Sequence, residues 1–581
     1  MNHLHRFLAL LACASLPALA VPPSIHGEPA IVPKAAPAAK LRLQVSPPIV
    51  SLAPVSDAEL FRVQQANRTR QKRVAIGLVR DADVVRNLPA APLVWHSVAG
   101  GYAAQAAVRS PDARALRLAI DLTGVREDMT MVFFGSDAPA HLEGPVRVGD
   151  VLDRTMAYWS PITDGDTQTV EFFMPAGVDA AEAPRLVGAS HLYTTIASGL
   201  KATGLGQAET CEIDVKCSSL FSDAAFDKMR NSVARMVFNK NGTTFLCTGQ
   251  VLNDTDPSSQ LPWFISGNHC FENTSLPLAS SSEMQTVASS LTTLWFFEAV
   301  TCSVPSDLTN PPSVQVSGGA KFIYNDPGDD TLLLRLNGTP PAGSFYAGWN
   351  AAAIPVGAQV VVVHHPEGDV KKVAQGHVIA YSAAQPDPVG GASTPFSEVM
   401  YFSGTTEKGS SGSGLFTFDG TEYQLRGTLY GGGADCSALS ATDWYSRFDQ
   451  AYPALAQYLS PAGTNVDYSD QWFNPAESGW GLNIVEHASQ NIFAVWFVFD
   501  ANGKPTWYTL PGGGWTGPTT FAGTLFATTG PPASGASFNA SAVRTRDVGS
   551  ATISFTDASH ATFSYTIDGV TGQKSITRQP F

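Results

Sequence analysis

One short stretch constrains this chain most: Glu407-Lys408-Gly409-Ser410-Ser411-Gly412-Ser413-Gly414-Leu415-Phe416. Its Gly and Ser residues alone would indicate a flexible linker. The strand-like run Leu415–Phe418 and the turn at Asp419-Gly420 instead hold this loop against a predicted hairpin. In a held loop the N–H groups of Gly409 and Ser411 can converge on one point, as an oxyanion hole requires. Ser411 is therefore a candidate nucleophile, with an ordinary polar turn as the alternative.

A serine nucleophile needs a base, and the base needs an acid that orients it. An apolar run that begins at Trp263 ends in His269, which directly precedes Cys270. A disulfide from Cys270 to the earlier Cys247 would tie two strands together beside this histidine. Asp330 comes immediately before the apolar run Thr331–Leu336, so its carboxylate can be buried beside the imidazole. The chain thus offers His, Asp and Ser candidates in that order.

These motifs together resemble those of the chymotrypsin-fold serine proteases, and most of all those of the bacterial lysyl endopeptidases. The resemblance rests on Cys-Thr-Gly, His-Cys, Asp before Thr-Leu-Leu-Leu-Arg-Leu, and Gly-Ser-Ser-Gly-Ser, and it covers residues 205–462. It implies a double six-stranded antiparallel β-barrel, with His269 as base, Asp330 as orienting acid and Ser411 as nucleophile. Asp330 keeps the family's spacing of apolar residues after the acid; Asp329 is its rival and Asp326 a weaker third candidate.

Three other histidines compete with His269, and they argue against a metal centre. His364, His365 and His377 all follow the candidate acid and lack an adjacent cysteine. Neighbouring residues of a strand point to opposite faces, so His364 and His365 make a poor pair of metal ligands. No Cys, His and carboxylate set completes a zinc site by its spacing. We therefore expect neither a metal nor another cofactor.

Composition and cysteine use favour an exported β protein. The 581 residues carry a net charge of −14 and few charged residues for their length, which argues against nucleic acid as a partner. Residues 1–20 resemble a signal peptide with cleavage after Ala20, and no later apolar run is long enough for a membrane span. Cys13 would leave with this signal. The remaining six cysteines allow 15 pairings; the family resemblance implies Cys211–Cys436, Cys217–Cys302 and Cys247–Cys270.

The resemblance also suggests how a substrate side chain is selected. Trypsin places its pocket acid six residues before the nucleophile, where this chain has Thr405. Lysyl endopeptidases place an Asp after the last cysteine, which indicates Asp443 as the acid that faces a substrate Lys, with Asp435 as its rival. Tyr430 and Gly431 lie on the expected substrate-pairing strand. Tyr430 replaces the family's His, and the Trp that stacks with that His in the family has no clear counterpart in Ser382–Phe396, so acceptance of Arg stays open.

The flanking regions predict further units. Residues 21–72 read as a Pro- and Ala-rich extended segment with a short helix, and 73–201 as a β-sandwich with the position of a propeptide. Lys201 in the following Gly-rich linker is a candidate self-processing site that precedes a protease domain at 202–462. Ser410 replaces the Asp that precedes trypsin's nucleophile, so activation is expected through propeptide removal. Residues 466–581 predict an aromatic-rich β module that resembles an uncharacterised repeat of exported bacterial proteins.

The sequence thus predicts a secreted, monomeric serine endopeptidase that cuts proteins or peptides after Lys, with Arg left open as a second accepted residue. Its own propeptide is an expected partner. The alternative is a catalytically weak protease-fold binding protein whose C-terminal module binds a surface or a polysaccharide.

Overall fold

The computed structural model describes most of the chain, and it is mainly β, as the sequence predicts. The described residues are 23–31, 38–68, 72–80, 93–175, 184–195, 208–256, 259–303, 313–460, 468–486, 491–500, 502–517, 519–532, 538–557 and 559–580. Ala20 and Lys201, with the expected signal segment and linker, lie outside these ranges. Within the described ranges we find no helix that is both long and apolar enough to cross a membrane.

The first half of the central region is a run of six antiparallel strands in the order β18-β15-β16-β17-β21-β20. Inward-facing side chains such as Met236, Phe264 and Leu334 form its core, and helix α4 packs against one end. Strand β19 extends the edge at β18. The bounds are β15 Val233–Lys240, β16 Thr243–Leu252, β17 Trp263–Gly267, α4 Ser281–Ser289, β18 Thr292–Trp295, β19 Val314–Val316, β20 Ala320–Asp326 and β21 Thr331–Leu336.

The second half is a closed six-stranded barrel in the order β28-β27-β24-β25-β26-β29, with β29 returning to β28. Helix α5 packs with strands of both halves around Trp263 and Phe416. The bounds in and beside this half are β14 Ile213–Asp214, α3 Ala224–Arg230, β22 Phe345–Tyr346, β23 Trp349–Asn350, β24 Gln359–His364, β25 Lys372–Ser382, β26 Phe396–Ser403, β27 Gly414–Phe418, β28 Tyr423–Gly432, β29 Thr442–Tyr445 and α5 Phe448–Leu459.

Three disulfides brace this central region. They are Cys211–Cys436, Cys217–Cys302 and Cys247–Cys270, the same pairings that the family resemblance implies. The first and second enclose long loops of the chain, so they restrict the unfolded state more than the third does.

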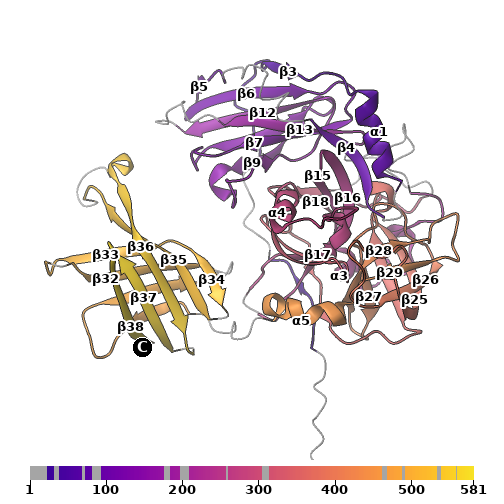
Figure 1. Ribbon diagram of the computed structural model, residues 1–581. Coiled ribbons are helices and arrows are strands. Elements are labelled where there is room, and N and C mark those ends of the chain that lie inside the picture. Colours follow the sequence, from indigo (N-terminus) through magenta and orange to yellow (C-terminus); the bar gives the residue numbers. More distant parts are fainter. Residues whose placement is uncertain are drawn as a thin grey trace, which may run out of the picture.

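The N-terminal region forms the predicted β-sandwich (Figure 1). One sheet has the order β3-β6-β12-β8-β9 with β5 at its edge; the other contains β10, β11, β7, β13 and β4. Side chains of both sheets, including Ile120, Phe133 and Phe172, form a shared core. The bounds are β3 Ile49–Ser51, β4 Val74–Arg80, β5 His96–Val98, β6 Gly101–Arg109, β7 Ala115–Asp121, β8 Thr130–Gly135, β9 Glu143–Arg147, β10 Tyr158–Trp159, β11 Thr163–Asp164, β12 Thr167–Pro175 and β13 Arg185–Leu192.

Strand β4 joins the N-terminal sandwich to the first six-stranded half. It pairs with β13 on one side and with β16 on the other, so one continuous sheet runs through both units. Helix α1 (Asp57–Ala66), with a capping box from Ser56 and Glu59, packs on β4. The predicted extended segment is also ordered in part: β1 (Ser24–Ile25) pairs with β23 and β2 (Glu28–Pro29) with β22.

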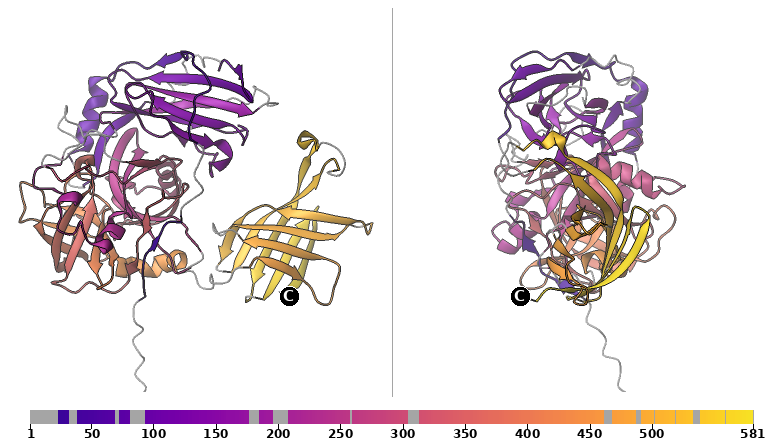
Figure 2. Two further views of the ribbon diagram at one scale, coloured as in Figure 1. Left: turned by 180° about the vertical axis from the view of Figure 1, so that it is seen from behind. Right: turned by 90° about the vertical axis from the view of Figure 1, so that its left-hand side faces the viewer.

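The C-terminal module is a separate antiparallel sheet, which stands apart from the other units in Figure 1 and in the left view of Figure 2. The sheet order is β33-β32-β31-β30-β38-β37-β36-β35-β34, and β33 also pairs with β35. The predicted hairpin at Asn502-Gly503 joins β32 to β33. Trp472 and Trp496 are buried, whereas Trp507 is exposed, so only part of the aromatic set serves the core. The bounds are β30 Asp470–Phe473, β31 Gly481–Glu486, β32 Ile492–Phe499, β33 Pro505–Leu510, β34 Gly514–Gly517, β35 Thr520–Thr529, β36 Arg544–Phe555, β37 His560–Ile567 and β38 Val570–Arg578.

Candidate active site

The structure brings His269, Asp330 and Ser411 together in one hydrogen-bonded line. His269 Nε2 lies 2.6 Å from Ser411 Oγ, and His269 Nδ1 lies 2.8 Å from Asp330 Oδ2. The histidine follows β17 and the aspartate precedes β21, which are paired strands of the first half; the serine precedes β27 of the second half. All three side chains are buried. The arrangement has the geometry of a nucleophile, a base and an orienting acid.

Asp330 is fixed by several contacts to the His269 segment. Its Oδ1 accepts from the His269 backbone N–H at 2.7 Å, and its carbonyl accepts from Asn268 N–H at 2.9 Å. Its φ of +60° is in the left-handed region, which a non-glycine residue holds only when its surroundings compensate for the strain. Burial raises the pKa of Asp330, while the adjacent His269 opposes that shift. The carboxylate is therefore a positioned partner for the imidazole.

The rival acids lie elsewhere. Asp329 is buried, its Oδ1 has no hydrogen-bond partner, and burial raises its pKa to about 7. Asp326 accepts from Gly328 N–H in its own turn at 2.7 Å. Neither carboxylate replaces Asp330 beside His269.

Asp329→Asn should stabilise the protein at pH 8 by on the order of 2 kcal/mol, with the gain shrinking as the pH falls toward 4. The native pKa is raised from 3.8 to about 7, so the native state holds the proton more tightly than the unfolded state does. The stability from this proton is present at low pH and is lost as the pH rises through 7; Asn avoids that loss. Urea unfolding of both proteins across this pH range measures it, and a gain that does not vary with pH would contradict the argument.

The loop that carries Ser411 is rigidly held rather than a linker. Gly409 has φ +93°, and a side chain there would meet the His365 carbonyl; Gly412 has φ +80° and a side chain would meet Ser266 and Thr248. Only glycine tolerates both the backbone conformation and the close approach. Thr248 on β16 adds two contacts: its N–H donates to Ser411 O at 2.8 Å, and its Oγ1 donates to Gly409 O at 3.0 Å.

The N–H groups of Gly409 and Ser411, the predicted oxyanion donors, both point at one oxygen. That oxygen is the carbonyl of Lys72, from the segment before β4; Gly409 N–H donates to it, and so does Ser411 N–H at 3.3 Å. Two backbone donors on one carbonyl oxygen beside a buried serine have the arrangement of an oxyanion hole.

The side chain of Lys72 fills a closed pocket that ends at Asp443. Its Nζ lies 2.6 Å from Asp443 Oδ2 and donates to Thr406 O at 2.9 Å and to Ala434 O at 2.7 Å. Tyr401, whose pKa is held above its usual value by burial and by neighbours that include Tyr445 and Asp443, donates to Asp443 at 3.1 Å. The pocket therefore presents one carboxylate, the Thr406 hydroxyl and two backbone carbonyls to an ammonium group.

The other predicted pocket residues differ in their placement. Asp435 accepts from Ser437 in its own turn instead of reaching Lys72 Nζ. Thr405 is buried, and the next residue, Thr406, contacts the ammonium. Sequence reasoning missed Thr406 and Ala434. Ala434 acts through its backbone carbonyl, which leaves no mark in residue type, whereas the Thr406 hydroxyl accepts from Lys72 Nζ and donates to Asp443, and a lone threonine is too common to be singled out.

Tyr430 and Gly431 lie on β28, next to the relay. The Tyr430 ring packs edge-on against His269, with centroids 5.4 Å apart. Phe396 packs against its other side at 5.5 Å. Phe396, at the end of Ser382–Phe396, is thus an aromatic partner of Tyr430 that the sequence did not single out.

The rival histidines have other contacts. His364 Nδ1 lies 2.8 Å from Ser410 Oγ, and burial lowers the pKa of His364 to about 3, which keeps it neutral. His365 Nδ1 contacts Asp369 O at 2.9 Å, and His377 packs on Phe402. These contacts give each of the three a structural role away from Ser411 Oγ.

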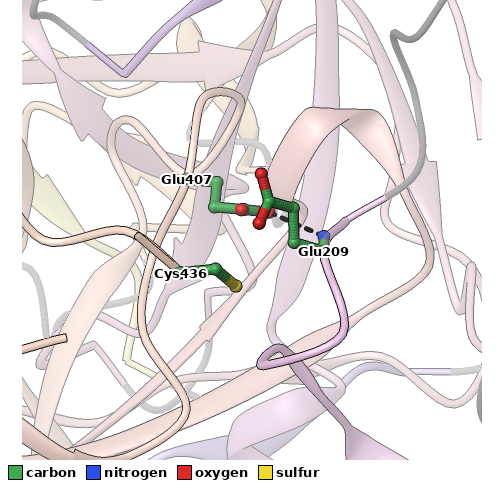
Figure 3. Close-up of side chains that lie close together, drawn as sticks. All are labelled: Glu209, Glu407 and Cys436. Carbon is green, nitrogen blue, oxygen red and sulfur yellow. Dashed lines mark hydrogen bonds between the residues drawn. The ribbon is translucent and has the colours of Figure 1, made fainter. Parts of the chain in front are cut away.

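A cavity of about 590 Å³ adjoins Lys72 and is lined by acidic side chains that include Glu209, Glu367, Glu407 and Asp435. Figure 3 shows Glu209 and Glu407 beside Cys436, a grouping with the ligand types of a metal site. The Cys436 sulfur is bonded to Cys211, so it offers no thiolate, and the Glu209 N–H donates to Glu407 at 3.1 Å. The grouping therefore reads as a brace between two loops.

The two six-stranded halves with a relay between them define the class of two-barrel proteases. Comparisons with known proteins specify the family. A family model described as "Lysyl endopeptidase, C-terminal domain" matches residues 205–446, and one described as "Lysyl endopeptidase N-terminal domain" matches residues 51–191. A lysyl endopeptidase of Pseudomonas aeruginosa is 34% identical over 372 residues, which are 62% of this chain and 76% of that protein. The chain belongs to the lysyl endopeptidase family and is a peptidase.

Solved structures similar to this chain include other proteases. The active form of the Rv3671c protease from M. tuberculosis is 18% identical, with a TM-score of 0.27, over 42% of this chain and 90% of that one. The MamO protease domain from Magnetospirillum magneticum is 12% identical, with a TM-score of 0.25, over 40% and 98%. At these scores the description of the fold rests on the strand pairing given above.

Proposed function

We propose that the protein is a secreted serine endopeptidase that hydrolyses peptide bonds after lysine. Ser411 Oγ attacks the substrate carbonyl, and His269 takes the serine proton and later returns it to the leaving amine. Asp330 holds the imidazole in the required orientation. The N–H groups of Gly409 and Ser411 stabilise the oxyanion. The resulting acyl-enzyme is then hydrolysed by water.

The observation that carries this proposal is the placement of Lys72. Its ammonium meets Asp443 at 2.6 Å while its carbonyl oxygen accepts from the N–H of Ser411 at 3.3 Å. A substrate lysine bound in the same way would present its carbonyl carbon to Ser411. Asp443 is fully buried, so an ammonium in the pocket exchanges its water for a direct charge contact.

The pocket favours lysine over arginine. The buried hydroxyls of Tyr401 and Tyr445 lie 2.5 Å apart, and Tyr401 also donates to Asp443, so two tyrosine rings pack beside the carboxylate that the ammonium meets. An arginine side chain is longer and ends in a planar fork, so it would push against these rings. The Lys72 ammonium already makes direct contact with Asp443, so a lysine side chain has the length that this site requires. This supports a specificity for Lys alone, where the sequence left Arg open as well.

Peptide pairs that differ only in Lys or Arg before the cut test this preference. We expect kcat/KM to be about 100-fold higher for the Lys peptide, because only the Lys side chain reaches Asp443 without displacing the tyrosines. A pair with Ala in the same position measures background cleavage. Equal values for Lys and Arg would contradict the proposed pocket.

Secretion and processing are part of the same proposal. The signal-like residues before Ala20, the disulfides and the family N-terminal domain support an exported precursor that loses its N-terminal region. Lys201 remains the proposed processing site, because it is the one lysine of the Gly-rich linker and would suit the enzyme's own specificity.

A further inference from the structure

A segment of the chain itself passes through the active site in the manner of a substrate. Lys72 is 5% exposed and Arg73 is 4% exposed, although both are cationic residues outside the two six-stranded halves. Lys72 satisfies the specificity pocket and the two oxyanion donors at once, as described above. Cationic side chains are rarely this buried unless they are paired. The burial of Lys72 and Arg73 therefore indicates that the active site holds specific binding groups for both side chains.

The residue on the other side of the Lys72 carbonyl is held just as firmly. Arg73 Nη1 donates to the backbone carbonyls of His269 at 2.6 Å, Glu272 at 3.1 Å and Cys270 at 3.2 Å. Its guanidinium also lies over the Phe245 ring, 4.8 Å from the centroid. Three carbonyls of the His269 segment thus form a cation site directly beyond the bond between Lys72 and Arg73.

The chain after Arg73 continues in extended form along the enzyme. Val74 pairs with Leu246 and Ala75 with Phe245, so β4 adds to β16 as an antiparallel strand. Leu246 precedes Cys247, whose disulfide to Cys270 adjoins His269. A peptide that adds to a sheet edge in this way binds through its backbone and inserts side chains into pockets. The segment from Lys72 to Ala75 does both: its backbone pairs with β16, and the side chains of Lys72 and Arg73 enter binding sites.

We propose that the peptide bond between Lys72 and Arg73 is an internal substrate bond, which blocks the active site of the intact chain and is cut there by Ser411 of the same chain. This proposal rests on the proposed function, because it needs a pocket that takes lysine and a reactive serine. It adds a cleavage site inside the N-terminal region, distinct from Lys201, and a cation subsite on the leaving-group side.

The reaction balances with groups already present. Ser411 Oγ forms an ester with the Lys72 carbonyl carbon as its proton passes to His269. The bond from that carbon to the Arg73 nitrogen breaks, and His269 delivers the proton to the new amine. Water then hydrolyses the ester, leaving a Lys72 carboxylate and a free serine.

The cut should not release either fragment at once. Arg73 stays held by its three carbonyls, and β4 stays paired with β16 and β13. On the other side of the cut, Val63 of α1 remains in the core of the first half. A leaving amine that is retained can attack the ester again, so we expect this self-cleavage to be slower than cleavage of a free peptide.

The first test maps the new N-termini of the purified full chain by mass spectrometry over time. We expect a terminus at Arg73 that forms with a first-order rate constant, and therefore a half-time, independent of protein concentration, as a reaction within one chain requires. Ser411→Ala and Lys72→Gln should each lack it, and Lys40→Gln, which changes an exposed lysine of the same region, should retain it. Absence of the Arg73 terminus in the wild-type chain, or a half-time that shortens as the protein concentration rises, would overturn the proposal.

The second test measures occupancy of the site without any cleavage. A fluorescein-labelled tripeptide that ends in lysine amide is titrated against Ser411→Ala chains by fluorescence anisotropy. Because a tethered segment competes at high effective concentration, adding Lys72→Gln should tighten binding at least about tenfold, while adding Lys40→Gln should not. Equal binding by all three chains would overturn the blocked site but leave the proposed function standing. Binding by none of them, with no cleavage of Lys peptides by the wild-type protein, would instead remove the proposed function.

Discussion

Replacing Ser411 with alanine should lower kcat by about 10⁵- to 10⁶-fold, and KM should rise because the uncut Lys72 segment keeps competing for the pocket. Ser411 Oγ lies 2.6 Å from His269 Nε2, so its loss removes the nucleophile and leaves the base without its proton donor. The pocket at Asp443 and the two oxyanion donors stay in place, because both N–H groups belong to the backbone. Steady-state kinetics on a Lys peptide measures both constants.

Ser413→Ala is the matched control for this substitution. Ser413 lies in the same loop, is fully buried, and its Oγ has no hydrogen-bond partner. Its substitution should leave kcat within about twofold of the wild-type value, since an unpaired buried hydroxyl contributes little. If Ser411→Ala kept more than a tenth of the activity, the serine mechanism would be wrong and the binding-protein alternative would gain support.

Asp443→Asn should lower kcat/KM for Lys peptides by about 10²- to 10³-fold. The Asp443 side chain is fully buried, and its Oδ2 lies 2.6 Å from Lys72 Nζ. Removing one member of a buried ion pair leaves the other charge without compensation, which costs about 3–5 kcal/mol. The amide keeps the size of the carboxylate, so the fold should be retained.

Asp435→Asn separates this charge contact from the general acidity of the region. Asp435 lines the neighbouring cavity, but its carboxylate accepts from Ser437 in its own turn. We expect kcat/KM to change by no more than about threefold, because partly exposed charges interact weakly across water. If kcat/KM fell by a similar factor in Asp443→Asn and Asp435→Asn, Asp443 would act through the net charge of the region and not through direct contact with the substrate ammonium.

The sequence could predict the relay because residue type and chain order both carry it. A His before a Cys, an Asp before an apolar strand and a Ser among glycines remain recognisable whatever the surrounding loops do. The choice of Asp330 over Asp329 was less secure, because neighbouring residues share the same sequence context. Only the structure shows that Asp330 turns toward His269 in a left-handed conformation, while Asp329 stays buried away from it.

The contacts of Lys72 could not be predicted in the same way. Lys72-Arg73 directly precedes a clear strand pattern, which is a signal in the sequence, but only the lysine of the later linker stands in a segment whose composition indicates processing. The register of β4 on β16 depends on pairing between residues far apart in the chain, and local patterns do not encode such pairing. Phe396 was missed for a related reason: its packing on Tyr430 joins two strands whose spacing depends on the whole barrel.

The most direct test of the account is a map of cleavage sites. The purified protein is incubated with a denatured test protein, and the new termini are identified by mass spectrometry. The account predicts that the wild-type protein cuts after lysine and that the Ser411→Ala protein, used in its place, makes no cuts. Cuts spread over residues other than lysine, or cuts that persist with Ser411→Ala, would contradict it.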